Sequence, residues 1–252
     1  MMARRGVFKM CGAYVMPLTW AEIVDHYNQF LESFENTGLN LPVNWNARPG
    51  QGMPVLVNVE GQCEVALSRW GLIPSWWKQD KPPAKTFNAR IESIQDQLAG
   101  KRGMWAGPMR YYRGLTVASG YYEWTGPKND RRPRFIQLPG GEVFSFASIW
   151  SWSEQYALSH SMITVPAEGK MLEVHSRMPV ILNPDAYAAW VNPKTDGKQA
   201  VELLQSNRCN ELIDFEVSKE LNFGRNSPEN IIKLQENAAD PADKNEQGEI
   251  LF

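Results

Sequence analysis

The chain holds few side chains that commonly act as acids, bases, nucleophiles or metal ligands. Its three histidines and three cysteines are scattered over 252 residues: His26, His160, His175, Cys11, Cys63 and Cys209. They form neither the H-E-x-x-H or two-histidine-carboxylate spacing nor the C-x-x-C pair typical of metal sites. An odd number of cysteines also gives no disulfide framework and is typical of a reducing compartment. We therefore expect neither a metal nor another cofactor.

Two titratable residues occur in contexts that suit catalysis. His175, in the run VHSRMPVIL, occupies a polar turn directly before an apolar segment, where an imidazole can face a cleft. Glu123, in GYYEW, is a carboxylate within an aromatic strand and could donate a proton there. Each also has an ordinary interpretation, since a lone histidine is more often structural and Glu123 could point to solvent. His26 is expected on the exposed side of a helix, without a role.

Charge is distributed unevenly along the chain although the net charge is only −2. Residues 69–134 contain 13 Lys and Arg against 5 Asp and Glu, whereas residues 196–252 contain 6 against 12. The basic stretch also contains five tryptophans: Trp70, Trp76, Trp77, Trp105 and Trp124. Cations interleaved with aromatic rings suit a groove that follows a phosphate backbone and stacks unpaired bases. The pattern favours single-stranded nucleic acid, and a merely uneven solvated surface is the alternative.

Hydrophobic periodicity outlines the elements that must position these residues. T-W-A-E at Thr19 is a capping box, and apolar residues at helical spacing up to Phe34 predict a helix that ends at residues 36–38. Further helices are expected over 93–99, 184–190 and 197–204. Short β-rich runs lie between the helices: 55–59, 64–70, 115–124, 134–138, 143–150, 161–165 and 178–182. This order predicts an α+β fold with a largely antiparallel, barrel-like β core and peripheral helices.

Composition places the chain among ordinary globular proteins. It is 43% hydrophobic and 21% charged, and no run approaches the roughly 18 apolar residues of a membrane-spanning helix. The start has no cleavage site of a signal peptide, so we expect a cytoplasmic protein, associated with the nucleoid when bound to DNA. We expect an N-terminal extension over 1–9, a single domain over 10–234 and a loosely ordered acidic tail over 235–252. A monomer is expected.

Six short motifs, in this order along the chain, resemble those of the SOS-response-associated peptidase (SRAP) family. They are M-C-G at 10–12, N-A-R-P-G at 46–50, W-G-L-I-P-S-W-W at 70–77, N-A-R-I-E-S at 88–93, G-Y-Y-E-W at 120–124 and H-S-R-M-P at 175–179. The resemblance implies a SRAP-like fold and an abasic-site processing protein of the DNA-damage (SOS) response, which captures single-stranded DNA covalently.

The capture chemistry that the resemblance implies depends on an N-terminal cysteine. An abasic deoxyribose opens to an aldehyde, an amine condenses with it to an imine, and a thiol two carbons away closes a thiazolidine ring. Only an N-terminal cysteine offers both groups at that spacing. Its α-amine, with a pKa of about 7.7–8.0, is on the order of 10% neutral at pH 7 and needs no unusual tuning.

Roles carried over from the family are assigned to the residues that match its motifs. Cys11 is the double nucleophile, Asn46 orients the opened sugar, Glu123 is the general acid and base, and His175 shuttles protons. The expected DNA contacts are two phosphate anchors, a stacking wall and a further backbone contact: Asn88 and Arg90, Trp76 and Trp77, and Arg177.

Two departures from the family pattern affect this assignment. The family often carries arginine two residues after the cysteine, where this chain has Ala13. Ten residues also precede Cys11, so its nitrogen is an amide in the full chain, and the reactive form should begin at Cys11. Two alternatives remain: a thiol autopeptidase that cleaves before Cys11, and a non-enzymatic module that binds single-stranded DNA.

Overall fold

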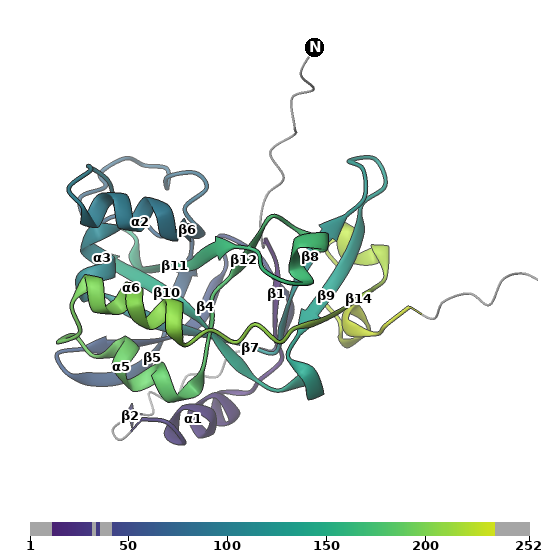
Figure 1. The fold of residues 1–252 in the computed structure, drawn as a ribbon, viewed down its shortest axis with the longest axis horizontal. Coiled ribbons are helices and arrows are strands. Elements are labelled where there is room, and N and C mark those ends of the chain that lie inside the picture. The colour runs from purple at the N-terminus through teal and green to yellow at the C-terminus, as the bar shows by residue number, and fades with distance from the viewer. Residues whose placement is uncertain (1–11, 32–33, 36–41, 235–252) are drawn as a thin grey trace, which may run out of the picture.

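The computed structural model describes residues 12–31, 34–35 and 42–234. Cys11, the expected extension over 1–9 and the expected tail over 235–252 therefore lie outside the described residues. Within the described segments the strands form two sheets, which lie side by side in Figure 1. The smaller sheet has the order β14, β9, β8, β1, β3, and the larger has the order β12, β11, β10, β7, β4, β5, β2.

The smaller sheet consists of five strands that all pair antiparallel in the described part of the chain. They are β1 (Tyr14–Met16), β3 (Asn44–Ala47), β8 (Gly120–Thr125), β9 (Arg132–Gln137) and β14 (Ile213–Glu216). The short β1 lies between β8 and β3, so the N-terminal end of the described chain enters the middle of this sheet.

The larger sheet closes on itself. Its path consists of β2 (Phe34–Glu35), β4 (Gly52–Val59), β5 (Gln62–Trp70), β7 (Arg113–Ala118), β10 (Phe144–Ser153), β11 (Ala157–Pro166) and β12 (Arg177–Pro179). Two short strands join it at the side, β6 (Asn88–Arg90) on β11 and β13 (Ile181–Leu182) on β10. Because β11 pairs with β10 on one side and runs parallel to β5 on the other, β4, β5, β11, β10 and β7 form a ring. The predicted α+β, barrel-like fold is confirmed.

Helices surround the barrel on the side away from the smaller sheet (Figure 1). They are α1 (Trp20–Asn28), α2 (Ile91–Leu98), α3 (Ala106–Tyr111), α5 (Tyr187–Val191) and α6 (Gly197–Ser206), while α4 (Met171–Val174) lies against β8. The predicted capping box of α1 is confirmed, with Thr19 as N-cap and Glu22 as its partner. No helix in the described segments is long and apolar enough to cross a membrane.

Several predicted boundaries are wrong. The first helix ends at Asn28 rather than at 36–38, and Phe34 instead begins β2 beside β5. The run 115–124 is two strands, because the chain leaves β7 at Ala118 and starts β8 at Gly120. His26 is half-buried against aromatic rings rather than exposed. Strands β1, β3, β6 and β14 and helices α3 and α4 were not predicted, since they are too short to show a clear period.

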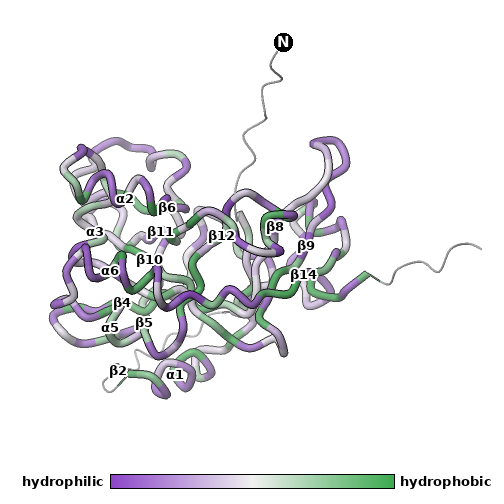
Figure 2. Tube along the Cα trace, in the orientation of Figure 1, coloured by the Kyte–Doolittle hydropathy of each residue, from purple (hydrophilic) through white to green (hydrophobic). Residues whose placement is uncertain are grey.

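Apolar residues concentrate where the strands cross, and hydrophilic residues lie on the loops and on the outer faces of the helices (Figure 2). Within this core His160 on β11 is fully buried at the closure of the barrel, where it pairs with Trp70 of β5. Its Nδ1 lies 3.0 Å from Ser68 Oγ, and its Nε2 has no protein hydrogen-bond partner. Burial lowers the pKa of His160 to about 3, so the folded protein keeps this imidazole neutral.

Replacing His160 by Asn should flatten the acid dependence of stability. An unfolded histidine binds a proton below pH about 6.5, while folded His160 resists protonation down to about 3. Its contribution is therefore intact above pH about 6.5 and is lost as the pH falls towards 3, by up to about 1.4 kcal/mol per pH unit. Asparagine can keep the contact with Ser68 but does not titrate. Urea unfolding over this pH range measures how the free energy of unfolding depends on pH in the two proteins. An equal pH dependence in both would contradict the low pKa of His160.

Candidate functional site

The pairing of β1 with β8 places the first described residue beside a predicted catalytic carboxylate. Tyr14 pairs with Tyr121, and the ladder extends past the strand because the Tyr122 N–H donates to the Ala13 carbonyl at 2.9 Å. One further step in this register brings Gly12 alongside Glu123. Glu123 is 2% exposed, so the predicted general acid is a buried residue next to the end of β1.

Helix α4 covers the face of β8 on which Glu123 lies. Side chains alternate along a strand, so Glu123 shares a face with Tyr121, whose hydroxyl lies 3.9 Å from Met171 Sδ on α4. His175 directly follows α4 and ends it. The fold therefore brings the two predicted proton-transfer residues to the same side of the smaller sheet.

His175 is half-buried and tied to the backbone two residues ahead. Its Nδ1 accepts a hydrogen bond from the Arg177 N–H at 3.0 Å and also lies 3.2 Å from the Arg177 carbonyl oxygen. Nδ1 thus has a donor and an acceptor within reach, so its contact with the backbone suits either protonation state. Burial is the main cause that lowers the pKa of His175, and the positive charges of Arg177 and Arg131 add to it. The ring is accordingly neutral near pH 7.

A cavity of about 600 Å³ opens beside Gly12 and is lined by several cations. We call it the Gly12 cavity; its walls include Gly12, Arg48, Phe87, Trp124, Lys128 and Arg131. None of its described lining residues is acidic. Its lining residues come from the start of β1, the end of β3, the segment before β6, the end of β8 with the hairpin that follows it, and the segment around Asn222.

Contacts from the C-terminal part of the domain brace this cavity. The Arg48 guanidinium lies 5.2 Å from the ring centre of Trp124 and donates to the Leu221 carbonyl at 3.1 Å. Trp124 Nε1 donates to Asn222 Oδ1 at 2.6 Å, and Asn222 Nδ2 donates to the Arg131 carbonyl at 3.2 Å. Asn222 therefore connects β8 to the hairpin.

The cations that line the cavity were not predicted as site residues from the sequence. Arg48 lies within the quoted N-A-R-P-G motif and Lys128 and Arg131 within the basic stretch, but one sequence gave no reason to single them out. The signal that identifies them is their common position around Gly12, which only the fold supplies.

Asn46 contacts the C-terminal part of the described chain. The register of β1 with β3 shifts between Tyr14 and Met16, so Trp45 and Asn46 together lie opposite Val15 in a bulge. The Asn46 side chain is buried, and its Nδ2 donates to the Arg225 carbonyl at 2.8 Å. The predicted convergence of Asn46 with the other catalytic candidates therefore does not follow from these contacts, and Cys11 lies outside the described residues.

The predicted phosphate anchors have different surroundings. Asn88 is buried at the start of β6, directly after the cavity residue Phe87, and Arg90 is exposed where α2 begins. Arg177 binds both carboxylate oxygens of Glu92, at 2.7 and 2.9 Å, and its side chain is 12% exposed. A phosphate at Arg177 would have to compete with Glu92, so this contact stays a prediction.

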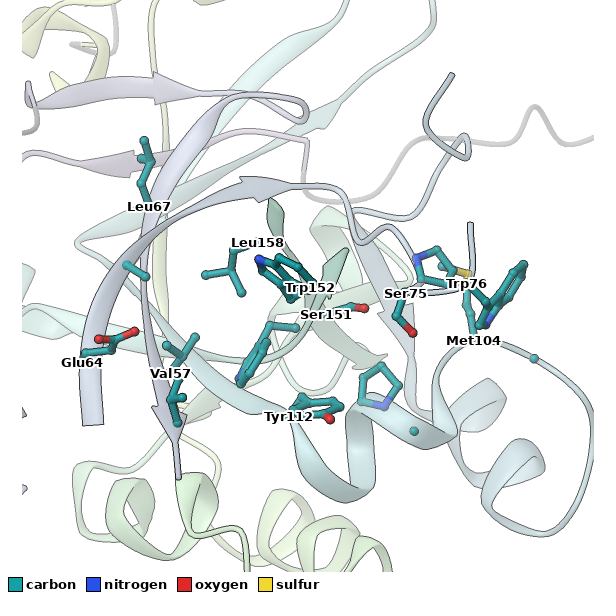
Figure 3. Close-up of a pocket in the computed structure, with 17 residues that line it drawn as sticks. Val57, Glu64, Leu67, Ser75, Trp76, Met104, Tyr112, Ser151, Trp152 and Leu158 are labelled. Atoms are coloured by element: carbon teal, nitrogen blue, oxygen red, sulfur yellow. The ribbon is translucent and has the colours of Figure 1, made fainter. Parts of the chain in front are cut away.

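The predicted stacking wall lies at a second, apolar cavity of about 770 Å³ (Figure 3). Trp76 lines it together with Met104, Tyr112 and Trp152, and the Trp76 residue is 62% exposed. Trp77 is half-buried, and its Nε1 donates to the Lys81 carbonyl at 2.9 Å. Trp76 is thus the more accessible stacking surface of the two.

Part of the basic stretch serves the fold rather than a ligand. Arg113 is 2% exposed, and its guanidinium donates hydrogen bonds to five backbone carbonyls. Arg134 pairs with the buried Asp214, and Arg69 donates to the Gly50 carbonyl at 2.7 Å. The excess of positive charge in this stretch therefore overstates the charge available to nucleic acid. In the described segments no three His, Cys, Asp or Glu side chains gather as a metal site would require.

Comparison with known proteins identifies the family. The sequence model of the family described as SOS response associated peptidase (SRAP) matches residues 10–223. The chain belongs to the SRAP family. This match begins at Met10 and includes each of the six motifs, and it ends within the C-terminal segment that braces the Gly12 cavity.

Relatives of this SRAP protein carry a common name. The chain is 28% identical over 232 residues to the abasic site processing protein YoaM of Bacillus subtilis, covering 90% of this chain and 99% of that one. It is 28% identical over 165 residues to the abasic site processing protein YedK of Escherichia coli, covering 64% and 70%. A solved protein from Bacteroides thetaiotaomicron shares the fold, with a TM-score of 0.73 at 18% identity, covering 89% of this chain and all of that one.

Removing the charge of Arg131 should raise the pKa of His175. The positive charge of Arg131 disfavours the imidazolium, although burial is the larger cause of the lowered pKa. In an NMR titration we expect His175 to titrate below about 6.5, and at a higher pH in Arg131→Gln than in the unmodified protein. Arg132→Gln, an exposed neighbour on the hairpin, is the matched control. An unchanged pKa in Arg131→Gln would show that Arg131 does not act on His175.

Proposed function

We propose that this chain captures abasic sites in single-stranded DNA by forming a thiazolidine with Cys11 as its N-terminal residue. The observation that carries the proposal is the position of Gly12 at a cationic cavity beside Glu123. Cys11 is joined to Gly12 by one peptide bond, which keeps their Cα atoms about 3.8 Å apart. Membership of the SRAP family and the shared name of the relatives support the processing of abasic sites.

The reaction requires only groups that an N-terminal Cys11 would provide. The amine lone pair attacks the aldehyde carbon of the opened deoxyribose, and the resulting carbinolamine loses one water to give an imine. The thiol then adds to the same carbon, and its proton passes to the nitrogen as the ring closes. No oxidant, metal or further reactant is consumed.

Glu123 and His175 would carry the protons of these steps. Loss of water from the carbinolamine needs an acid at the leaving hydroxyl, and Glu123, which is buried beside Gly12, would supply it. His175, neutral near pH 7, can accept the proton that the attacking amine releases. Asn46, whose side chain also donates to the Arg225 carbonyl, would orient the opened sugar.

DNA contacts would extend from this point along the surface. Arg90 is exposed at the start of α2, and Asn88 lies one residue after the cavity wall at Phe87, so both could hold phosphates near the lesion. Trp76 offers an exposed face on which an unpaired base can stack.

The cysteine must lose the residues before it for this chemistry to occur. An amide nitrogen does not form an imine, so the reactive chain would begin at Cys11, through removal of Met10 as an initiator or through cleavage of the bond between them. A thiol autopeptidase activity, which the family description suggests, could perform that cleavage with Cys11 itself. The two activities are compatible.

A denaturing gel tests the proposal directly. A chain that begins at Met10 and is trimmed to Cys11 should form a heat-stable adduct with a single-stranded oligonucleotide carrying one abasic site. The same chain with all ten preceding residues should form none until it is processed. Glu123→Gln keeps the shape of the side chain but cannot donate a proton as an acid. This variant should form the adduct about 10²-fold or more slowly.

Two controls make the gel decisive. An intact oligonucleotide of the same sequence should form no adduct, and intact-mass spectrometry should confirm the N-terminus of each chain. Efficient capture by a chain verified to retain Met1 to Met10 would overturn the mechanism. Binding without any adduct from a chain verified to begin at Cys11 would favour the non-enzymatic DNA-binding alternative.

A further inference from the structure

A bidentate ion pair crosses β11 and joins the elements on its two edges. Thr164 of β11 pairs with Pro179 of β12 and with Arg90 of β6, so these two strands lie on opposite edges of β11. Arg177, at the start of β12, donates to the Thr164 carbonyl at 2.7 Å. It also donates to both carboxylate oxygens of Glu92, in the first turn of α2, at 2.7 and 2.9 Å.

Glu92 interacts with both arginines that are expected to contact DNA phosphates. Hydrogen bonds from Arg177 are the main cause that lowers the pKa of Glu92, and the positive charges of Arg177 and Arg90 add to it. The Glu92 side chain is 50% exposed, whereas that of Arg177 is 12% exposed. The carboxylate is therefore ionised near pH 7 and is the more accessible member of the pair.

A carboxylate and a phosphate bind a guanidinium in the same way, by accepting two parallel hydrogen bonds from its planar fork. Glu92 takes these bonds from Nη1 and Nη2 of Arg177. Nη2 also donates to Thr164, and the remaining donor, Nε, is buried and has no protein hydrogen-bond partner. A phosphate that approached from solvent would therefore have to replace Glu92 to bind Arg177 through two hydrogen bonds.

We infer that Glu92 competes with DNA phosphate for Arg177 and so weakens reversible binding to undamaged single strands. The inference rests on the proposed function, which supplies the DNA strand as the ligand. In the free protein the carboxylate holds the guanidinium, and a phosphate must displace it. Contacts with undamaged DNA are thus kept weak, while covalent capture makes attachment at an abasic site lasting. Glu92 is in this sense a residue that determines specificity for damaged DNA.

Reversible binding to an intact oligonucleotide tests the inference. The full chain and its Glu92→Gln variant are titrated against a fluorescently labelled, undamaged single strand, and fluorescence anisotropy gives the dissociation constants. We expect Glu92→Gln to bind about two- to fivefold more tightly, the range that corresponds to the coupling energy of an exposed ion pair.

The salt dependence of binding gives a second readout. When a phosphate displaces Glu92, the phosphate releases a counterion and the freed carboxylate takes one up. In Glu92→Gln no carboxylate takes up a counterion. The slope of log Kd against the logarithm of the salt concentration should therefore be steeper by about 0.7, the value of one phosphate contact with a single strand.

Two controls separate competition from a general effect of charge. Glu173 is an exposed carboxylate on α4, so Glu173→Gln removes one negative charge elsewhere and should tighten binding less than Glu92→Gln does. The second control combines Glu92→Gln with Arg177→Gln. Compared with Arg177→Gln alone, the double variant should gain no more affinity than Glu173→Gln does, because the guanidinium for which Glu92 competes is gone.

The outcomes distinguish this inference from the proposed function. Unchanged or weaker binding in Glu92→Gln, or a gain no larger than that of Glu173→Gln, would overturn the competition. Weaker binding would show instead that Glu92 orients Arg177 for the phosphate. If neither the unmodified chain nor Glu92→Gln binds the intact strand, the competition is also overturned. The proposed function is judged separately by the abasic adduct on the denaturing gel, and its failure would not alter the binding measured with intact DNA.

Discussion

The register between β1 and β8 is the constraint on which the site depends. Side chains alternate along a strand, so a slip of one residue would turn Tyr14 away from the core and move Gly12 away from Glu123. Tyr14 is fully buried between the two sheets, with its ring 5.1 Å from that of Trp70 in an edge-to-face contact. The same residues that hold the sheets together therefore fix where the chain before Gly12 can emerge.

The surroundings of Gly12 and His175 favour the uncharged form of an amine or imidazole. Burial is the main cause that lowers the pKa of His175, and the positive charge of Arg131, which lines the Gly12 cavity, adds to it. In the proposed mechanism, cations next to Gly12 would by the same physical effect lower the pKa of an α-amine at Cys11 and enlarge its neutral, nucleophilic fraction.

Much of the fold could be predicted from the sequence, because it is determined by contacts between residues that are close together in the chain. The capping boxes at Thr19 and Asp196 and the glycine after α2 determine helix ends through contacts within a few residues. The strands that form the barrel are long enough to show their apolar character. The family resemblance, carried by six motifs, is confirmed by the match over residues 10–223.

What the sequence could not show depends on contacts between distant segments. Arg113 counts as a basic residue in the chain but is buried on carbonyls from beyond residue 189, and Arg177 is engaged by Glu92, 85 positions away. Asn46 lies in a bulge of β3, and its side chain donates to the Arg225 carbonyl, 179 positions away. A single sequence does not reveal such pairings, because bulges and long-range ion pairs leave no periodic pattern.

The most direct test of the account is to locate the bond between the protein and an abasic oligonucleotide. The adduct would be digested with a protease and a nuclease, and the modified peptide sequenced by mass spectrometry. The account predicts one product: a peptide whose first residue is Cys11, heavier by the sugar fragment less one water, formed without a reducing agent. A linkage at a lysine, at Cys63 or at Cys209, or at Cys11 inside a longer peptide, would contradict it.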